Sequence, residues 1–138
     1  MTPPAKPYLL LADDDPDDQE MFVDAFLRRY PGATIHYCKD GREVLAYLGQ
    51  CPTNELPLAM LLDYKMPVTT GAQVLEVIKD NIRFQRIRKL VWSTSNNKEF
   101  IDECLRYGAD RYFVKPNDVR QMDEIVAYIV AIFKTQRA

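Results

Sequence analysis

Short apolar runs alternate with longer amphipathic stretches along the chain. The runs are rich in aliphatic and aromatic residues, as expected of β-strands, and the stretches between them repeat apolar residues at helical spacing. About five repeats of this pattern predict an α/β fold with a parallel sheet, because parallel strands need helical crossovers. The predicted strands are residues 8–12, 34–38, 58–62, 89–93 and 111–114. The first and third are almost wholly apolar, which predicts central strands covered on both faces.

The stretches between and after these runs predict five helices. Asp15 and Pro16 suit the N-cap and first position of the first helix. The third helix opens near Gly71 and extends its apolar face to Ile82, and Gly108 closes the fourth. The predicted apolar faces comprise Val23, Phe26, Leu27 and Tyr30; Val44, Leu45 and Leu48; Val74, Leu75, Ile78 and Ile82; Ile101, Cys104 and Leu105; and Met122, Ile125, Val126, Ile129 and Phe133.

Length and composition indicate one folded domain. The chain has 138 residues, of which 47% are hydrophobic and 28% charged. We predict this domain over residues 8–134, after a disordered proline-rich tail at residues 1–7 and without an output domain. Two prolines and little periodicity predict an extended loop at residues 50–57, which serves either as a contact surface or as a neutral spacer.

Charge and hydropathy exclude several functional classes. A net charge of -2 gives no field that attracts nucleic acid. No apolar stretch reaches the roughly 18 residues of a membrane span, and the first residues lack the apolar core of a secretion signal. We therefore expect a cytoplasmic protein that binds neither nucleic acid nor membrane. A basic group, interpreted as solvated charges at a helix end rather than a patch for nucleic acid or an acidic partner, comprises Lys79, Arg83, Arg86, Arg88 and Lys89.

The cysteines and the histidine indicate structural roles. Three widely spaced cysteines without a Cys-x-x-Cys pair favour neither a disulfide framework nor a zinc site. The single histidine, His36, lies in a run of strand-forming residues, and one histidine does not build a metal cluster. We therefore interpret Cys38, Cys51, Cys104 and His36 as structural.

Polar residues that can bind a metal ion or take part in a reaction stand where four predicted strands end. They are Asp13, Asp14 and Asp15 after the first, Asp63 after the third, Ser93 and Thr94 at the fourth, and Lys115 after the fifth. The carboxyl ends of parallel strands share one edge of a sheet, so these side chains are expected in one crevice. Singly, each has an ordinary alternative as a helix cap, a turn residue or an exposed lysine. Two carboxylates 4 Å apart repel by about 4 kcal/mol at an effective dielectric of about 20, and Mg²⁺ is the oxygen-binding cation that suits such a cluster.

The order of these residues resembles the receiver domain of two-component response regulators. The similar motifs are Asp13-Asp14, Asp63 followed by Met66-Pro67 and Gly71, Ser93-Thr94, and Lys115-Pro116. The resemblance extends from about residue 8 to residue 133. It implies a flavodoxin-like (βα)5 fold, with a doubly wound parallel five-stranded sheet in the order 2-1-3-4-5. The loop at residues 50–57 and the lack of an output domain resemble stand-alone, chemotaxis-regulator-like receivers related to cyanobacterial phytochrome response regulators.

The resemblance implies the chemistry of the site. Asp63 would accept a phosphoryl group from a phosphohistidine on a sensor histidine kinase or a histidine phosphotransfer protein. Lys115 would neutralise the charge that builds up during transfer. Mg²⁺ would be held by Asp13, Asp14, Asp63 and the backbone carbonyl of Lys65, with Asp15 as a further candidate.

The resemblance also implies a switch. Ser93 would be the hydroxyl that moves toward the phosphoryl group, with Thr94 beside it. Tyr112 would be the aromatic side chain that then fills the vacated space. The coupled surface would be formed by the fourth helix, the fifth strand and the fifth helix, where a downstream protein would bind.

Two departures from the family pattern leave other functions open. Lys65 stands two residues after the acceptor, and Thr69-Thr70 replace the more frequent acidic residue before Gly71. Both make the lifetime of the phosphorylated form an open question. The leading hypothesis is a single-domain response regulator that catalyses only its own phosphorylation and dephosphorylation. One alternative is a receiver-fold interaction module that does not turn over. Another is a phosphatase or phosphotransferase of the haloacid dehalogenase type, which also uses an aspartate nucleophile. That type has a second aspartate two positions after the first, and this chain has Lys65 there.

The last predicted helix suggests self-association. Its apolar residues Ile125, Tyr128, Ile129 and Ile132 cover more of the helix surface than a single core-facing stripe needs. We therefore predict a homodimer formed through this helix.

Overall fold

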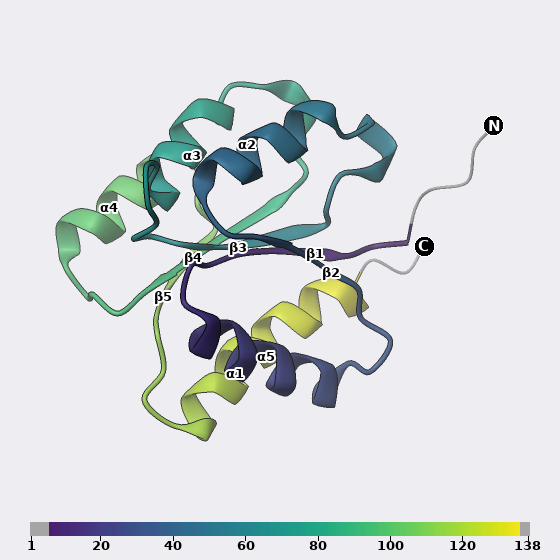
Figure 1. Cartoon of the computed structure of the whole chain (residues 1–138), viewed down its shortest axis with the longest axis vertical. Coiled ribbons are helices and arrows are strands. Elements are labelled where there is room, and N and C mark those ends of the chain that lie inside the picture. Colours follow the sequence, from purple (N-terminus) through teal and green to yellow (C-terminus); the bar gives the residue numbers. More distant parts are fainter. Residues whose placement is uncertain (1–5, 136–138) are drawn as a thin grey trace.

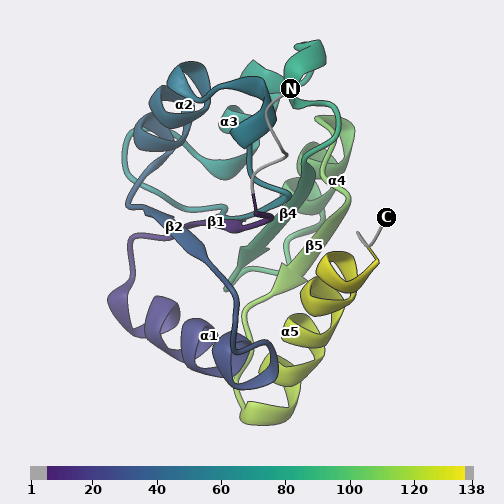
Figure 2. The same cartoon turned by 90° about the vertical axis from the view of Figure 1, so that its right-hand side faces the viewer.

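Five parallel strands form one sheet with helices on both faces (Figures 1 and 2). The computed structural model describes residues 6–135. Its strands are β1 (Leu9–Ala12), β2 (Ile35–Cys38), β3 (Ala59–Asp63), β4 (Arg88–Ser93) and β5 (Arg111–Val114). Its helices are α1 (Pro16–Arg29), α2 (Gly41–Gln50), α3 (Gly71–Ile78), α4 (Lys98–Arg106) and α5 (Val119–Lys134), with short 3-10 helices η1 (Thr53–Glu55) and η2 (Ile82–Phe84).

The sheet has the order β2-β1-β3-β4-β5, which confirms the expected flavodoxin-like topology. In β1, Leu10 pairs with His36 of β2 on one side and with Met60 of β3 on the other. Helices α1 and α5 cover one face, and α2, α3 and α4 cover the other (Figure 1). From β1 the chain adds β2 on one side, and it then crosses back to add β3, β4 and β5 on the other. The strand order therefore reverses between β1 and β3, and in such folds ligands bind at the carboxyl ends of the two strands on either side of this point.

Alternate residues of the central strands enter two separate hydrophobic cores. In β1, Leu10 and Ala12 pack on the side of α2, α3 and α4, whereas Leu9 and Leu11 pack on the side of α1 and α5. Every residue of β1 and β3 is buried, while the edge strands β2 and β5 are partly exposed. The wholly apolar runs therefore form central strands, as predicted.

Side-chain caps fix where the helices begin. Asp15 accepts hydrogen bonds from two backbone amides of the first turn of α1, and Pro16 follows it, as the sequence predicts. Thr70 caps α3 in a reciprocal arrangement with Gln73. Asn97 and Asp118 cap α4 and α5 by accepting the backbone amides of Glu99 and Gln121. The helix starts therefore follow from local sequence.

The third helix is shorter than its apolar pattern predicts. It ends at Ile78, and Asn81 then starts η2 by accepting a hydrogen bond from the amide of Arg83. Ile82, predicted in the core-facing stripe, is 85% exposed. Leu27 and Leu105 are exposed as well, so their placement on a buried face was also wrong. Apolar residues recur at helical spacing through these positions. At Ile82 the helix has already ended, and at Leu27 and Leu105 the rotation of the helix turns the side chain away from the sheet.

The loop at residues 50–57 packs against the rest of the chain. Its centre forms η1, and Cys51 is buried. The hydroxyl of Tyr8 donates to the carbonyl of Glu55 at 2.6 Å and lies 2.6 Å from the hydroxyl of Tyr47. These contacts join the loop to β1 and α2. The predicted tail at residues 1–7 lies outside the described residues except for Lys6 and Pro7, and Lys6 donates to the carbonyl of Gly32.

The α5 residues from which self-association was predicted pack within the chain. Ile125, Ile129 and Ile132 are buried against the sheet and α1, and Tyr128 packs beside Phe113. These side chains are therefore used mainly in the core, which removes the reason given for a homodimer, and the homodimer itself stays an untested prediction. No helix among residues 6–135 is long and apolar enough to span a membrane.

Candidate functional site

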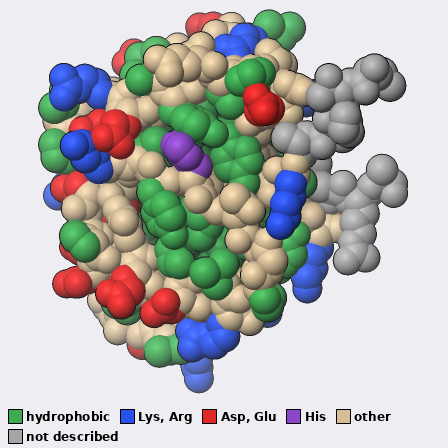
Figure 3. Space-filling view, turned by 45° about the vertical axis from the view of Figure 1, so that its right-hand side comes forward, with side chains coloured by type: hydrophobic (Ala, Val, Ile, Leu, Met, Phe, Trp, Pro, Cys, Tyr) green, Lys and Arg blue, Asp and Glu red, His purple; other side chains and the backbone are tan. Residues whose placement is uncertain are grey.

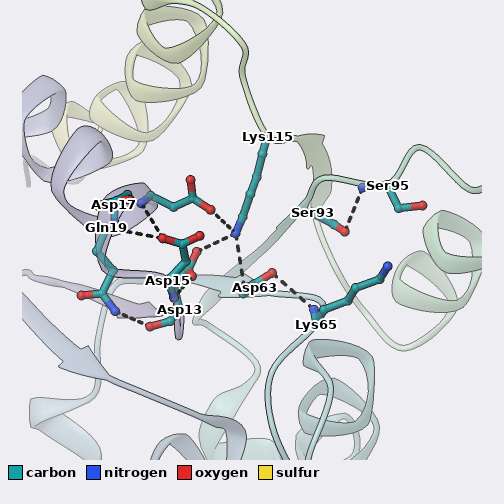
Figure 4. A network of polar contacts seen from close by, with 10 residues as sticks. Asp13, Asp15, Asp17, Gln19, Asp63, Lys65, Ser93, Ser95 and Lys115 are labelled. Atoms are coloured by element: carbon teal, nitrogen blue, oxygen red, sulfur yellow. Dashed lines mark hydrogen bonds and ion pairs between the residues drawn. The ribbon is translucent and has the colours of Figure 1, made fainter.

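The strand ends bring together the acidic and basic side chains that the sequence singles out. Asp13 follows β1 directly, Asp63 is the last residue of β3, and Lys115 follows β5. Figure 4 shows the side chain of Lys115 descending between the aspartates. Ser93 ends β4, and its carbonyl accepts the backbone amide of Lys115 at 2.7 Å. The prediction that these four residues lie together at the carboxyl edge of the sheet is confirmed.

The ammonium of Lys115 is the centre of this cluster. Its Nζ lies 3.0 Å from Oδ2 of Asp13, 3.3 Å from Oδ2 of Asp63 and 2.7 Å from Oδ2 of Asp18. It also lies 5.1 Å from the ring centroid of Trp92, which supplies an aromatic wall. Only 9% of the lysine side chain is exposed, so water screens these contacts weakly.

Helix α1 holds the β1 end of the site in place. The amide of Asp15 donates to Oδ1 of Asp13 at 2.8 Å, and the side chain of Gln19 donates to the carbonyl of Asp13. Sequence reasoning missed both Asp18 and Gln19, because it treated the start of α1 only as a capped helix end. The available signal was their position within the first two turns of a helix that begins at a strand end.

Glycine 71 allows the β3–α3 loop to close over Asp63. A Cβ at this position would lie 2.8 Å from the carbonyl oxygen of Asp63, closer than such atoms approach in proteins. The amide of Gly71 donates to the carbonyl of Tyr64, which completes the turn. The Asp63 to Gly71 spacing noted in the sequence therefore has a steric cause.

Burial and mutual repulsion raise the proton affinity of the carboxylates. Burial raises the pKa of Asp63 to about 7, the charge of Asp13 adds to the effect, and Lys115 opposes it. Burial also raises the pKa of Asp13, against the hydrogen bond from the amide of Asp15 and the charge of Lys115. Burial lowers the pKa of Lys115, but its contacts with Asp18, Asp13 and Asp63 outweigh this, so its pKa is raised and the ammonium stays charged.

Three carboxylates are placed to hold a metal ion. Oxygen atoms of Asp13, Asp14 and Asp63 all lie within 4.8 Å of one another. Oδ2 of Asp13 is fully buried, and its one polar contact among the described residues is the ion pair with Lys115 at 3.0 Å. Asp14 is exposed, which leaves one side of the group open to solvent. An oxygen-only donor set with an open side fits Mg²⁺. Asp15, the further candidate ligand, is used instead as the cap of α1.

The proposed switch residues are connected through Ser95, which sequence reasoning missed. The hydroxyl of Ser93 is buried and accepts the amide of Ser95 at 3.1 Å. The hydroxyl of Tyr112 donates to the carbonyl of Ser95 at 2.7 Å. Thr94, which lies between Ser93 and Ser95 in the sequence, is exposed. Movement of the loop after β4 would therefore change the contacts of Ser93 and Tyr112 together.

Lys65 contacts the acidic site through its backbone only. Its amide donates to Oδ1 of Asp63 at 3.3 Å. Its side chain points away from Asp63 in Figure 4, and the ammonium lies 5.9 Å from the ring centroid of Phe100 on α4. Tyr64 stacks on the same ring with a centroid distance of 4.4 Å. The side chain of Lys65 therefore leaves the space beside Asp63 free.

The remaining candidates have structural roles. All three cysteines are buried and free. The ring of His36 stacks on Tyr47 at 3.8 Å, and Figure 3 shows hydrophobic side chains around it. In the basic group, Lys89 was wrongly interpreted as solvated, because it is buried and donates to the carbonyls of Phe84 and Ile87. Arg88 pairs with Asp110 at 3.5 Å.

Comparison with known proteins gives a consistent family. The sequence model of the response regulator receiver domain matches residues 9–127. Two-component response regulator ORR11 of Oryza sativa subsp. indica is 29% identical over 112 residues, which cover 81% of this chain and 73% of that protein. Two-component response regulator ARR5 of Arabidopsis thaliana is 31% identical over 122 residues, which cover 81% of this chain and 66% of that protein.

Solved structures with the same fold include the response regulators RcpA and Rcp1. The phosphorylated cyanobacterial phytochrome response regulator RcpA superposes with a TM-score of 0.84 at 26% identity, covering 97% of this chain and 98% of that chain. The Mn(2+)-bound form of response regulator Rcp1 superposes with a TM-score of 0.77 at 23% identity, covering 96% of this chain and 97% of that chain. The second similarity establishes the fold alone.

Proposed function

Because the chain belongs to the response regulator receiver domain family, we propose that Asp63 accepts a phosphoryl group from the phosphohistidine of a sensor histidine kinase or a histidine phosphotransfer protein. The observation that carries this proposal is the buried ammonium of Lys115, which lies 3.0 Å from Asp13 and 3.3 Å from Asp63 at the carboxyl edge of the sheet. The similarity to RcpA, whose structure is that of a phosphorylated protein, supports it.

The transfer needs no group beyond those of the two proteins and a divalent ion. A carboxylate oxygen of Asp63 attacks the phosphorus of the phosphohistidine, a P–O bond forms, and the P–N bond breaks. The electron pair of that bond returns to the imidazole nitrogen, which takes a proton from solvent when it needs one. Lys115 supplies positive charge to the phosphoryl oxygens as their charge is redistributed. The chemistry of the chain is then limited to its own phosphorylation and dephosphorylation.

Oxygen atoms of this chain are placed to bind the divalent ion that such a transfer uses. Asp13, Asp14, Asp63 and the backbone carbonyl of Lys65 would hold Mg²⁺, which supplies charge neutralisation at the phosphoryl oxygens when bound. The buried Oδ2 of Asp13, whose one polar contact among the described residues is with Lys115, supports this assignment. Asp14 then provides a ligand from the solvent side.

Phosphorylation is proposed to act on partners through α4, β5 and α5. It adds about -1.5 to -2 charges and new acceptor oxygens beside Ser93. The contacts of Ser93 and Tyr112 with Ser95 connect this position to the surface of these elements. Val114 and Val119 are exposed there and offer apolar contact to a downstream protein. A cytoplasmic location is part of this proposal.

The test compares wild type with Asp63→Asn and with Asp123→Asn, a control at an exposed acid on α5. Each protein is incubated with Mg²⁺ and acetyl phosphate, and the added phosphoryl group is located by mass spectrometry. Wild type and Asp123→Asn are expected to carry an acid-stable but base-labile phosphoryl group on Asp63, and Asp63→Asn none. Equal labelling of all three proteins would disprove the assignment. Absence of labelling in all three would favour a receiver-fold interaction module that does not turn over.

A further inference from the structure

Lys115 has a third acidic partner besides the two residues of the proposed phosphorylation and metal sites. Asp18 lies on α1, 97 residues away in sequence, and its Oδ2 accepts a hydrogen bond from the Lys115 ammonium at 2.7 Å. This contact is shorter than those with Asp13 at 3.0 Å and Asp63 at 3.3 Å. The tightest partner of the lysine is therefore neither the acceptor nor a candidate metal ligand.

The three contacts surround the whole ammonium group. An ammonium carries three N–H donors, and three carboxylate oxygens lie within 3.3 Å of this one. A phosphoryl oxygen added beside Asp63 therefore competes with an oxygen already present. One of the existing contacts must lengthen when Lys115 turns to the phosphoryl group.

Exposure decides which contact is released at the lowest cost. The side chain of Asp18 is 29% exposed, whereas those of Asp13 and Asp63 are 0% and 6% exposed. A carboxylate that loses its partner is hydrated at the first position, but would remain buried and unpaired at the others. Asp18 is therefore the partner that Lys115 can leave.

We propose that Asp18 is a positioning residue that holds Lys115 in the unphosphorylated protein and releases it to the phosphoryl group. This inference rests on the proposed function, since it concerns the same lysine and the same acceptor. Asp18 touches neither the acceptor nor the phosphoryl group, and it acts by competing for the ammonium. Its presence lowers the affinity of the site for a phosphoryl group, and its removal raises that affinity.

The chain provides a matched control for this proposal. Asp17 is the neighbouring acid in the same turn of α1 and is exposed, and its side chain has no ion pair among the described residues. Asp17→Asn and Asp18→Asn change the net charge equally and remove an acid from the same helix start. A difference between the two variants therefore isolates the contact with Lys115.

The experiment titrates beryllofluoride into each Mg²⁺-loaded protein and follows Trp92. This residue is the single tryptophan, is fully buried, and has the Lys115 ammonium 5.1 Å from its ring centroid. Asp18→Asn and Asp18→Ala are expected to bind beryllofluoride about threefold more tightly than Asp17→Asn, the effect of one partly exposed ion pair. Asp18→Glu, which keeps the charge, is expected to restore affinity toward the wild-type value.

A second readout avoids both the metal and the phosphoryl mimic. In metal-free protein, the emission of Trp92 is expected to change in Asp18→Asn and to stay at the wild-type value in Asp17→Asn, because Lys115 moves only in the first. Equal beryllofluoride affinity of the two variants, or weaker binding by Asp18→Asn, would overturn the inference while leaving Asp63 as acceptor. No binding by wild type would instead disprove the proposed function, and the inference with it.

Discussion

Replacement of Asp63 by asparagine is expected to stabilise the metal-free protein. The site holds Asp13 and Asp63 as buried carboxylates with one ammonium between them, and repulsion and burial penalise their ionised forms. Asparagine keeps the shape of the side chain and cannot ionise. Lys115 loses one partner but retains Asp13 at 3.0 Å and Asp18 at 2.7 Å, so it does not become an unpaired buried charge.

The size and sign of the effect follow from the pKa of Asp63. This pKa is about 7 in the folded protein and 3.8 for an ordinary aspartate. Because the folded state holds the proton more tightly, stability from this group is present in full below pH 3.8 and is lost as the pH rises toward 7. The whole difference corresponds to about 4 kcal/mol. This pKa already includes the opposing effect of Lys115, and we expect Asp63→Asn to gain between about 1 and 4 kcal/mol at pH 8.

Urea unfolding in EDTA, measured at several values between pH 4 and pH 8, tests this reasoning. The advantage of Asp63→Asn over wild type should be smallest near pH 4 and grow as the pH rises, while exposed Asp123→Asn should stay within about 0.5 kcal/mol of wild type. An advantage that is independent of pH would refute the pKa argument. A variant less stable than wild type at pH 8 would show that the ion pair with Lys115 outweighs the burial penalty.

Three further outcomes are expected. Millimolar Mg²⁺ should raise the melting temperature of wild type at pH 8, and EDTA should reverse the rise; an unchanged melting temperature would contradict the metal site. Gly71→Ala should lower the unfolding free energy by about 1 to 3 kcal/mol, because its Cβ would meet the Asp63 carbonyl, whereas Gly49→Ala, with open space, should be neutral or stabilising. Tyr64→Phe should lose about 1 kcal/mol in urea unfolding, because its hydroxyl donates to Glu103 at 2.7 Å, and no loss would mean that water replaces this bond.

Strand-end reasoning correctly placed four polar residues along one edge of the sheet. Asp13, Asp63, Ser93 and Lys115 each stand next to an apolar run, and parallel strands must place these ends along one edge. The same reasoning failed for Ile82, because helical periodicity describes where apolar residues fall but does not detect a break caused by the cap of Asn81. Homodimerisation was inferred from the width of the apolar surface of α5 alone, and α5 buries most of that surface against α1 and the sheet.

The sequence by itself determined the order of strands and helices, the cap of α1 and the shared edge of Asp13, Asp63, Ser93 and Lys115, because these depend on local patterns and on the shared direction of parallel strands. Only the tertiary structure decided which carboxylate Lys115 contacts most closely, since Asp18 and Lys115 meet through the packing of α1 beside the β5 end of the sheet. It also decided that the Lys65 ammonium lies near Phe100 and not beside the carboxylate of Asp63. Distances between side chains from different elements depend on helix rotation and packing, which no local pattern specifies.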